Sequence, residues 1–245
     1  MSEHIEVPAE DLETLRKFDT PTVCNVIELF GVVPNSAGYM DQRIQACFPK
    51  LPPMVGYAST AIFSSQAPHN DPEAHQGMDL VLESFENLPG PPVMVYQDID
   101  QPAASATFGD IMCSVYKHFG AQGLITSGCG RDLDQVEAID FPVFTNGTIC
   151  AHGYCYHLAV NRNVYVGGIT VSPGDLLHGD RNGVTAIPLE IASTVASLLD
   201  DFVAAEAVIL DAVKAGCNHE GFKKSRLESK KMITAIAERA KASLK

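Results

Sequence analysis

The segment between residues 93 and 126 constrains the fold more than any other part of the sequence, because it reads as strand, helix and strand. Residues 93–96 and 124–126 are short apolar runs, and residues 109–119 have helical spacing that ends at Gly120. Two strands joined in this way run parallel with a right-handed crossover. The start of the helix and the residues after the second strand must then share one edge of the sheet, where open α/β sheets bind ligands.

The residues brought to that edge are typical of a small-anion site with a place for a divalent cation. Asp110 opens the helix, whose first N–H groups have no partner within the helix, and Arg131 and Asp132 follow the glycine turn at 128–130. A guanidinium can hold a carboxylate in a fork, and carboxylate oxygens suit Mg²⁺ or Mn²⁺. A 2-oxo acid offers the matching oxygens. The competing interpretation is a plain helix cap beside a surface ion pair.

Elsewhere, hydrophobic periodicity predicts continued alternation of helices and strands. Within the helix over 109–119, we expect Ile111, Met112, Val115 and Phe119 to face inward. Polar segments at 64–77 and between the later strands are expected to be loops. The expected helices are 9–18, 21–30, 78–87, 188–216 and 219–245, and the expected strands are 55–63, 143–145, 164–166, 169–171 and 184–187.

Charge and hydropathy exclude several classes of protein. The net charge of -13 disfavours a surface that follows nucleic-acid phosphates. The chain has no apolar run of about 18 residues and no basic then apolar leader at its N-terminus, so we expect neither membrane insertion nor export. The seven cysteines are an odd number without a CxxC pair, which indicates reduced thiols. These features predict a soluble cytoplasmic protein.

The scarcity of lysine in the central body bears on mechanism. Lys117 is the only lysine between Leu51 and Val213, and nothing around it indicates burial. A Schiff-base enzyme needs a desolvated lysine, so for a carbonyl substrate we expect a metal ion to act as the electrophile.

Four motifs carry a resemblance to a known family. They are F-G-D-I-M at 108–112, G-C-G-R-D at 128–132, P-V-F-T-N-G at 142–147, and V-S-P-G-D at 171–175 leading to D-R-N-G-V at 180–184. In order and spacing, over roughly residues 17 to 215, the chain resembles the RraA-like family. That family includes the 4-hydroxy-4-methyl-2-oxoglutarate/4-carboxy-4-hydroxy-2-oxoadipate aldolases.

The resemblance implies an architecture and an assembly. The expected fold is an α/β layered domain like the swivelling β/β/α domain, with N-terminal and C-terminal helices. Residues 1–216 would form one catalytic domain, and residues 217–245 a basic helical extension. The resemblance further implies a homotrimer or a dimer of trimers, with active sites between neighbouring subunits.

The resemblance also implies a role for each site residue. Asp132 resembles the direct metal ligand for Mg²⁺ or Mn²⁺, and Glu206 resembles an acid that a neighbouring subunit contributes to the metal. Asp110 resembles the residue that orients a metal-bound water. The residues that resemble the binding site for the 2-oxo acid carboxylate are Gly109, Ile111, Met112 and Arg131.

The resemblance, together with the site residues, implies a divalent-metal-dependent lyase that cleaves a 4-hydroxy-2-oxo acid to pyruvate and a carbonyl product, with oxaloacetate decarboxylation as a side activity. Two alternatives remain open: a protein-binding regulator of ribonuclease E, and a hydratase or lyase acting on another oxo or sugar acid. The chain departs from the family pattern at Ser127, where an aspartate is usual, and at Asp79, where an asparagine is frequent. These departures concern the choice of substrate more than the metal clamp.

Other reactive residues carry weaker signals. The pairs His152 and His157, and His69 and His75, have spacings that could hold a metal, but loop histidines beside aromatics are more often packing or surface groups. His178 precedes a turn, and a structural role is favoured. Cys129 lies within the glycine turn, but no base that could activate a thiol is evident.

Overall fold

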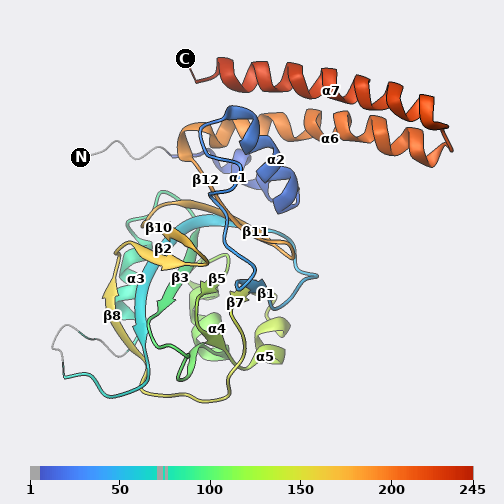
Figure 1. Cartoon of the computed structure of the whole chain (residues 1–245). Coiled ribbons are helices and arrows are strands. Elements are labelled where there is room, and N and C mark those ends of the chain that lie inside the picture. Colours follow the sequence, from blue (N-terminus) through green and yellow to red (C-terminus); the bar gives the residue numbers. More distant parts are fainter. Residues whose placement is uncertain (1–5, 71–73, 75–76, 245) are drawn as a thin grey trace.

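A curved mixed sheet forms the centre of the molecule, in a computed structural model that describes residues 6–70, 74 and 77–244 (Figure 1). Its strands lie in the order β1-β7-β5-β3-β2-β11-β12, and β8 also pairs with β2. Two further strand pairs, β4 with β6 and β9 with β10, complete the layered domain. The strands are β1 (Gln45–Ala46), β2 (Met54–Ser64), β3 (Pro92–Asp98), β4 (Ala106–Phe108), β5 (Leu124–Thr126), β6 (Cys129–Gly130), β7 (Val143–Thr145), β8 (Tyr156–Val160), β9 (Val164–Val166), β10 (Ile169–Val171), β11 (Leu176–Asp180) and β12 (Gly183–Ile187).

The predicted crossover is confirmed. β3 and β5 pair in parallel, with Met94 opposite Leu124, and α4 (Asp110–His118) connects them. β5 in turn pairs in parallel with β7, and β3 with β2. Four neighbouring strands therefore point their carboxyl ends to the same edge of the sheet.

β2 is the strand at which the sheet branches. It pairs with β3 on one side, and on the other with β11 over its first half and with β8 over its second half. Nearly all of its residues are buried, because both of its faces are covered. The strand therefore contributes to apolar clusters on both sides of the sheet.

Two groups of helices cover the sheet (Figure 1). α3 (Asp79–Phe85), α4 and α5 (Leu133–Ala138) lie on the body itself, while a separate layer holds α1 (Ala9–Leu15), α2 (Thr20–Phe30), α6 (Ala192–Lys214) and α7 (His219–Ala242). A short 3-10 turn, η1 (Leu189–Ile191), leads into α6. The layer packs on the sheet through a shared apolar cluster that reaches from Leu12 to Ile236.

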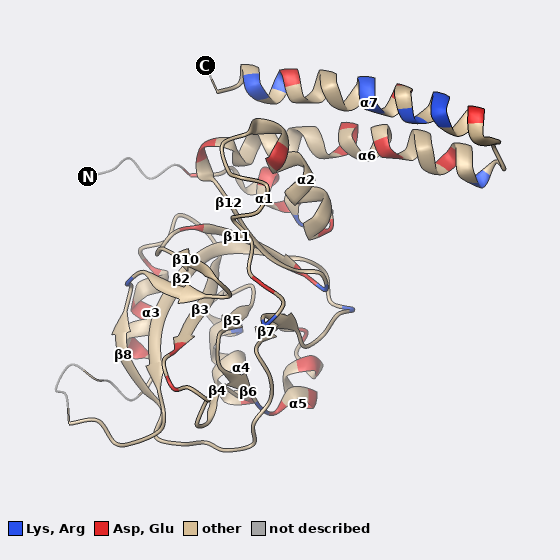
Figure 2. Ribbon diagram, viewed as in Figure 1, with Lys and Arg blue, Asp and Glu red and all other residues tan. Residues whose placement is uncertain are grey.

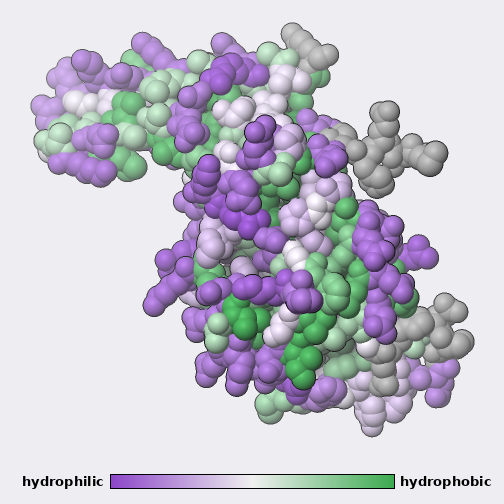
Figure 3. Space-filling model, turned by 180° about the vertical axis from the view of Figure 1, so that it is seen from behind, coloured by the Kyte–Doolittle hydropathy of each residue, from purple (hydrophilic) through white to green (hydrophobic). Residues whose placement is uncertain are grey.

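The C-terminal basic segment is a helix that packs along α6. Figure 2 shows Lys and Arg residues at several positions along α7, while the charged residues of α6 are mostly acidic. Ile236 and Ala240 of α7 are buried against the helical layer. The far part of this helix pair projects beyond the body, and hydrophobic residues lie among its hydrophilic ones when it is seen from behind (Figure 3).

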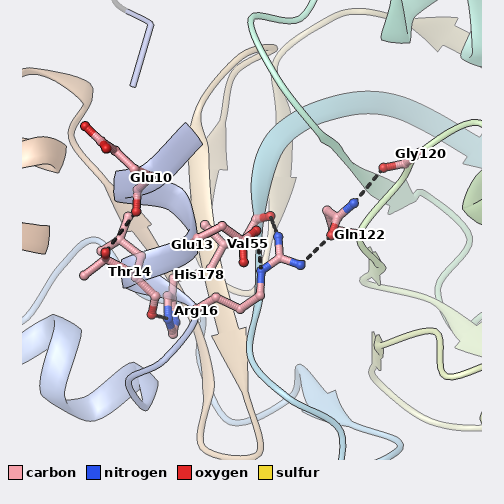
Figure 4. A network of polar contacts seen from close by, with 9 residues as sticks. Glu10, Glu13, Thr14, Arg16, Val55, Gly120, Gln122 and His178 are labelled. Carbon is pink, nitrogen blue, oxygen red and sulfur yellow. Dashed lines mark hydrogen bonds and ion pairs between the residues drawn. The ribbon is translucent and has the colours of Figure 1, made fainter. Parts of the chain in front are cut away.

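A polar network fastens the helical layer to the sheet (Figure 4). Arg16, which follows α1, donates through Nη1 to Gln122 Oε1 over 2.7 Å and through Nη2 to Val55 O over 3.3 Å. His178 of β11 is fully buried, with Nε2 lying 3.0 Å from Leu15 O and Nδ1 lying 3.0 Å from Thr20 Oγ1. These contacts place α1 and α2 relative to the strands.

Two predictions about local structure are wrong. The inward face of α4 is formed by Cys113 and Tyr116, whereas Ile111 and Phe119 are 70% and 56% exposed. Tyr116 can be buried because its hydroxyl bonds the Tyr96 hydroxyl over 2.5 Å, which apolar periodicity could not reveal. His178 lies within β11 and not before a turn, because its backbone pairs with β2 and β12. Its ring is accommodated there because both nitrogens have partners in the helical layer.

Within the ranges that the structure describes, no helix is both long enough and apolar enough to cross a membrane.

Candidate active site

Two short strands bring the halves of the predicted site together. β4 ends at Phe108 and β6 ends at Gly130, and these strands pair in parallel. The Arg131 N–H donates to Phe108 O over 3.2 Å, which continues the pairing past the strand end. Asp110 and Asp132, which follow the two strands, are therefore neighbours as the topology required.

The carboxylate of Asp132 is the centre of this arrangement. Its Oδ2 accepts a hydrogen bond from the Asp110 N–H over 3.3 Å and lies 3.4 Å from Arg131 Nε. The backbone of Asp132 is left-handed, with φ 56° and ψ 37°, just before α5 begins. A non-glycine residue rarely adopts this conformation, and such residues cluster at functional sites. About a third of each side chain is exposed, 34% for Asp132 and 31% for Arg131, so the pair faces solvent.

Gly109 permits the close approach of Asp132 to the start of α4. A Cβ added to Gly109 would lie 2.5 Å from Asp132 Oδ2 and 3.2 Å from Arg131 Nε. Any side chain at this position would have to displace the carboxylate. Gly109 therefore shapes the predicted substrate-binding site through its missing side chain.

The amides at the start of α4 differ in their availability. The Ile111 N–H is bonded over 2.7 Å by the Oδ1 of Asp110. The Met112 N–H makes no hydrogen bond with any residue that the structure describes. A ligand that used both amides would need the Asp110 side chain to turn away from Ile111. The exposed Ile111 side chain lies beside this position and can contact the ligand.

Glu206 does not join Asp132 within one chain. It lies on α6 in the helical layer, while Asp132 lies at the start of α5 on the body (Figure 1). Partial burial, and to a smaller extent the charge of Asp19, raise the pKa of Glu206. A role for Glu206 at the site therefore requires a second copy of the chain.

The donor atoms present are compatible with a hard divalent cation. Among the described residues, no group of three or more histidine, cysteine, aspartate or glutamate side chains could hold a metal. Asp132 and Asp110 nevertheless each keep one carboxylate oxygen without a hydrogen bond to the described part of the chain. Mg²⁺ commonly binds through one or two carboxylates and retains several waters, so this sparse set of oxygens fits it.

The weaker candidates have structural roles where they are described. His157 is buried and stacks on Tyr96 with ring centroids 5.5 Å apart. His69 contacts the ring of Tyr156 edge-on, and His75 lies outside the described residues. Burial raises the pKa of Cys129, which opposes formation of a thiolate nucleophile.

Three polar residues at the ends of the parallel strands were not predicted to bind a ligand. Asp98 ends β3, Ser127 follows β5 and Asn146 follows β7. The topological rule that selected Arg131 and Asp132 applies equally to them. They were missed because no recognised motif surrounds Asp98, and because Ser127 and Asn146 carry no charge.

Comparison with known proteins gives the same family as the motifs. A model of the RraA-like family, described as Aldolase/RraA, matches residues 20–186. The "Putative 4-hydroxy-4-methyl-2-oxoglutarate aldolase" of Halalkalibacterium halodurans is 32% identical over 105 residues, which is 42% of this chain and 49% of that protein. "Uncharacterized protein MJ0644" of Methanocaldococcus jannaschii is 34% identical over 87 residues, 35% of this chain and 42% of that protein. The chain thus spans less than half the length of these two relatives.

Solved structures share the fold. An uncharacterized protein from Pseudomonas syringae pv. tomato superimposes with a TM-score of 0.68 at 22% identity, covering 90% of this chain and 98% of that chain. Streptomyces coelicolor RraAS2, described as an unusual member of the RNase ES inhibitor RraA protein family, gives 0.65 at 22% identity, covering 82% and 96%. At this level of identity the likeness concerns the fold alone.

Proposed function

The chain belongs to the RraA-like family, and from that membership and the geometry around Asp132 we propose that it is a divalent-metal-dependent lyase. Its reaction would be cleavage of a 4-hydroxy-2-oxo acid to pyruvate and a carbonyl product. The observation that carries the proposal is the Asp132 carboxylate, held 3.3 Å from the Asp110 amide and 3.4 Å from Arg131 Nε. Oxaloacetate decarboxylation would be a second activity, since it also breaks the C3–C4 bond of a 2-oxo acid and releases pyruvate.

Arg131 and the start of α4 would bind the substrate carboxylate. The guanidinium approaches Asp132 through Nε, and its terminal nitrogens would be used for a two-pronged bond to the substrate. The Met112 amide offers a further donor at the positive end of the helix dipole. The substrate would thus be held by its 2-oxo acid end, with its variable end pointing away.

Asp132 would hold Mg²⁺ or Mn²⁺. Bound there, the ion would act as a Lewis acid on the 2-oxo group and stabilise the negative charge that develops as the C3–C4 bond breaks. Arg131 lies next to the same position and contributes a fixed positive charge.

Asp110 would move the proton. Its Oδ1 is bonded to the Ile111 amide, which fixes the carboxylate, and its Oδ2 accepts no hydrogen bond from the described residues. Oδ2 can accept the proton of the C4 hydroxyl, directly or through one water, and the proton can then return to C3 of the pyruvate product. This assignment gives Asp110 a role in chemistry, and Arg131 a role in binding.

The assembly that suits this proposal is a homotrimer or a dimer of trimers. In it, Glu206 of a neighbouring subunit would face Asp132 and add a carboxylate to the metal position. The separation of Glu206 from Asp132 within one chain is consistent with a shared site of this kind.

A substrate screen with matched variants tests the proposal. The purified protein is given 4-hydroxy-4-methyl-2-oxoglutarate, other 4-hydroxy-2-oxo acids and oxaloacetate, each with Mg²⁺ or Mn²⁺, and pyruvate release is measured. We expect turnover of at least one of these acids, and a rise of tenfold or more in KM for Arg131→Lys because the fork is lost. Asp134→Asn, which changes an exposed aspartate two residues from the site, should behave as the wild type. Absence of pyruvate from every substrate would contradict the proposal.

A further inference from the structure

A cavity opens at the carboxyl ends of β3, β5 and β7. It has a volume of about 230 Å³ and is lined by the strand-end residues Asp98, Ser127 and Asn146. Arg43, in the turn before β1, and Tyr165 of β9 also line it. None of its lining residues belongs to the Arg131–Asp132 site, so the cavity is distinct from that site. This edge is where open α/β sheets commonly bind ligands.

A buried carboxylate without a partner lies in this cavity wall. The Asp98 side chain is 3% exposed, and its Oδ1 accepts the Asp100 N–H over 2.9 Å. Its Oδ2 is buried and has no hydrogen-bond partner among the described residues. A Cβ added to Gly128 would lie 2.3 Å from this oxygen, so the glycine makes room for it. Buried polar atoms are almost always bonded, and an exception calls for an explanation such as a ligand.

The neighbouring polar side chains are also available to a ligand. The side-chain amides of Asn146 and Gln101 make no hydrogen bond with any described residue. Gln97 uses its Oε1 to accept the Tyr165 N–H over 2.8 Å, which leaves its Nε2 donors. The cavity therefore offers one strong acceptor and several amide donors and acceptors.

The charges around the cavity disfavour an ionic ligand. Asp98 would repel an anion. Arg43 at the rim would repel a cation, although its charge is partly balanced by Asp41, whose oxygens it meets at 2.9 and 2.6 Å. A neutral molecule with several hydroxyl groups can donate to Asp98 and bond the amides, and the exposed Tyr165 ring offers an apolar surface to its carbon atoms. The volume lies below the range of drug-sized pockets, so the ligand must be small.

We propose that this cavity is a binding site for a small polyol or sugar, which donates a hydroxyl hydrogen to the Asp98 carboxylate and bonds the side-chain amide of Asn146. The site does not depend on the proposed lyase activity, because it shares no residue with it. Its occupant would bridge the ends of three parallel strands.

Calorimetric titration tests this site directly. Glycerol, erythritol, xylitol, ribose, xylose and glucose are titrated one by one into the full-length protein. We expect saturable binding of at least one of them, weakened roughly tenfold or more both by Asp98→Asn and by Asn146→Ala, because each removes a hydrogen bond that the site requires. Asp134→Asn and Asn35→Ala change an exposed aspartate and an exposed asparagine elsewhere, and they should leave binding unchanged.

Two results would overturn the proposal. One is that none of the six compounds saturates the protein at concentrations up to about 50 mM. The other is that binding persists in Asp98→Asn and Asn146→Ala but is lost in Asp132→Ala, which would place the ligand at the lyase site. Circular dichroism of each variant confirms that loss of binding is not loss of the fold.

Discussion

Replacing Asp98 with asparagine should stabilise the protein at neutral pH, because the wild-type carboxylate is ionised there in an unfavourable place. Its side chain is 3% exposed and one of its oxygens is unpartnered among the described residues. Burial raises the pKa of Asp98 to about 6, an effect that the Asp100 N–H bond partly offsets and the Asp100 charge reinforces. The native state therefore holds this proton more tightly than the unfolded chain does.

The sign and size of the effect follow from the two pKa values. With a folded pKa of about 6 and an unfolded value of 3.8, the stability contributed by Asp98 is fully present below pH 3.8 and is lost as pH rises through 6. The gap between these values corresponds to about 3 kcal/mol above pH 7. About 2 kcal/mol of this falls between pH 4.5 and pH 7.5.

Urea unfolding of the wild type and Asp98→Asn at several pH values measures this contribution. The variant should gain about 2 kcal/mol in free energy of unfolding over the wild type between pH 4.5 and pH 7.5. A fixed cost of packing the asparagine amide shifts all points equally and does not change this slope. A difference between wild type and Asp98→Asn that stays constant with pH would refute the reasoning.

Three further experiments have expected outcomes. Gly109→Ala should lower pyruvate release roughly tenfold or more with little change in melting temperature, since its Cβ would lie 2.5 Å from Asp132 Oδ2 and 3.2 Å from Arg131 Nε and would displace these partly exposed side chains; wild-type activity would contradict this. Burial lowers the pKa of His178, so stability from its neutral ring is complete above pH 6.5 and is lost as pH falls below it. An NMR titration of the His178 ring should therefore give a midpoint below 6.5, and a midpoint above it would be evidence against this account. Asp19→Ala should cost about 1 kcal/mol in urea unfolding because Asp19 accepts the Thr22 N–H at the start of α2, and an unchanged midpoint would show that the cap contributes nothing.

Much of the fold followed from local sequence signals. β5, β7, β9 and β10 have the predicted bounds, since each is an apolar run between turn residues. β4 and β6 could not be predicted, because strands of three and two residues carry no periodicity. β11 was missed because His178 and Asp180 interrupt its apolar pattern. Both residues have hydrogen-bond partners in the distant helical layer, which local sequence does not reveal.

The candidate site was predictable where topology determined it and not where contacts determined it. The expected pair of parallel strands joined by a helix was sufficient to predict that Asp110 lies near Arg131 and Asp132. The bond between Asp110 and the Ile111 amide depends on a side-chain rotamer, which sequence does not specify. The position of Glu206 relative to Asp132 depends on assembly, so one chain cannot determine it. The unpartnered oxygen of Asp98 depends on the packing of Gly128 against it.

The measurement that tests the proposed lyase most directly is pyruvate release by the wild type and Asp132→Ala, each with Mg²⁺, with a chelator, and after Mg²⁺ is restored. The account predicts that the wild type loses activity with the chelator and regains it with Mg²⁺, while Asp132→Ala is slower by roughly 100-fold or more under all three conditions. Asp134→Asn should follow the wild type throughout. Full and chelator-resistant pyruvate release by Asp132→Ala would contradict the central claim.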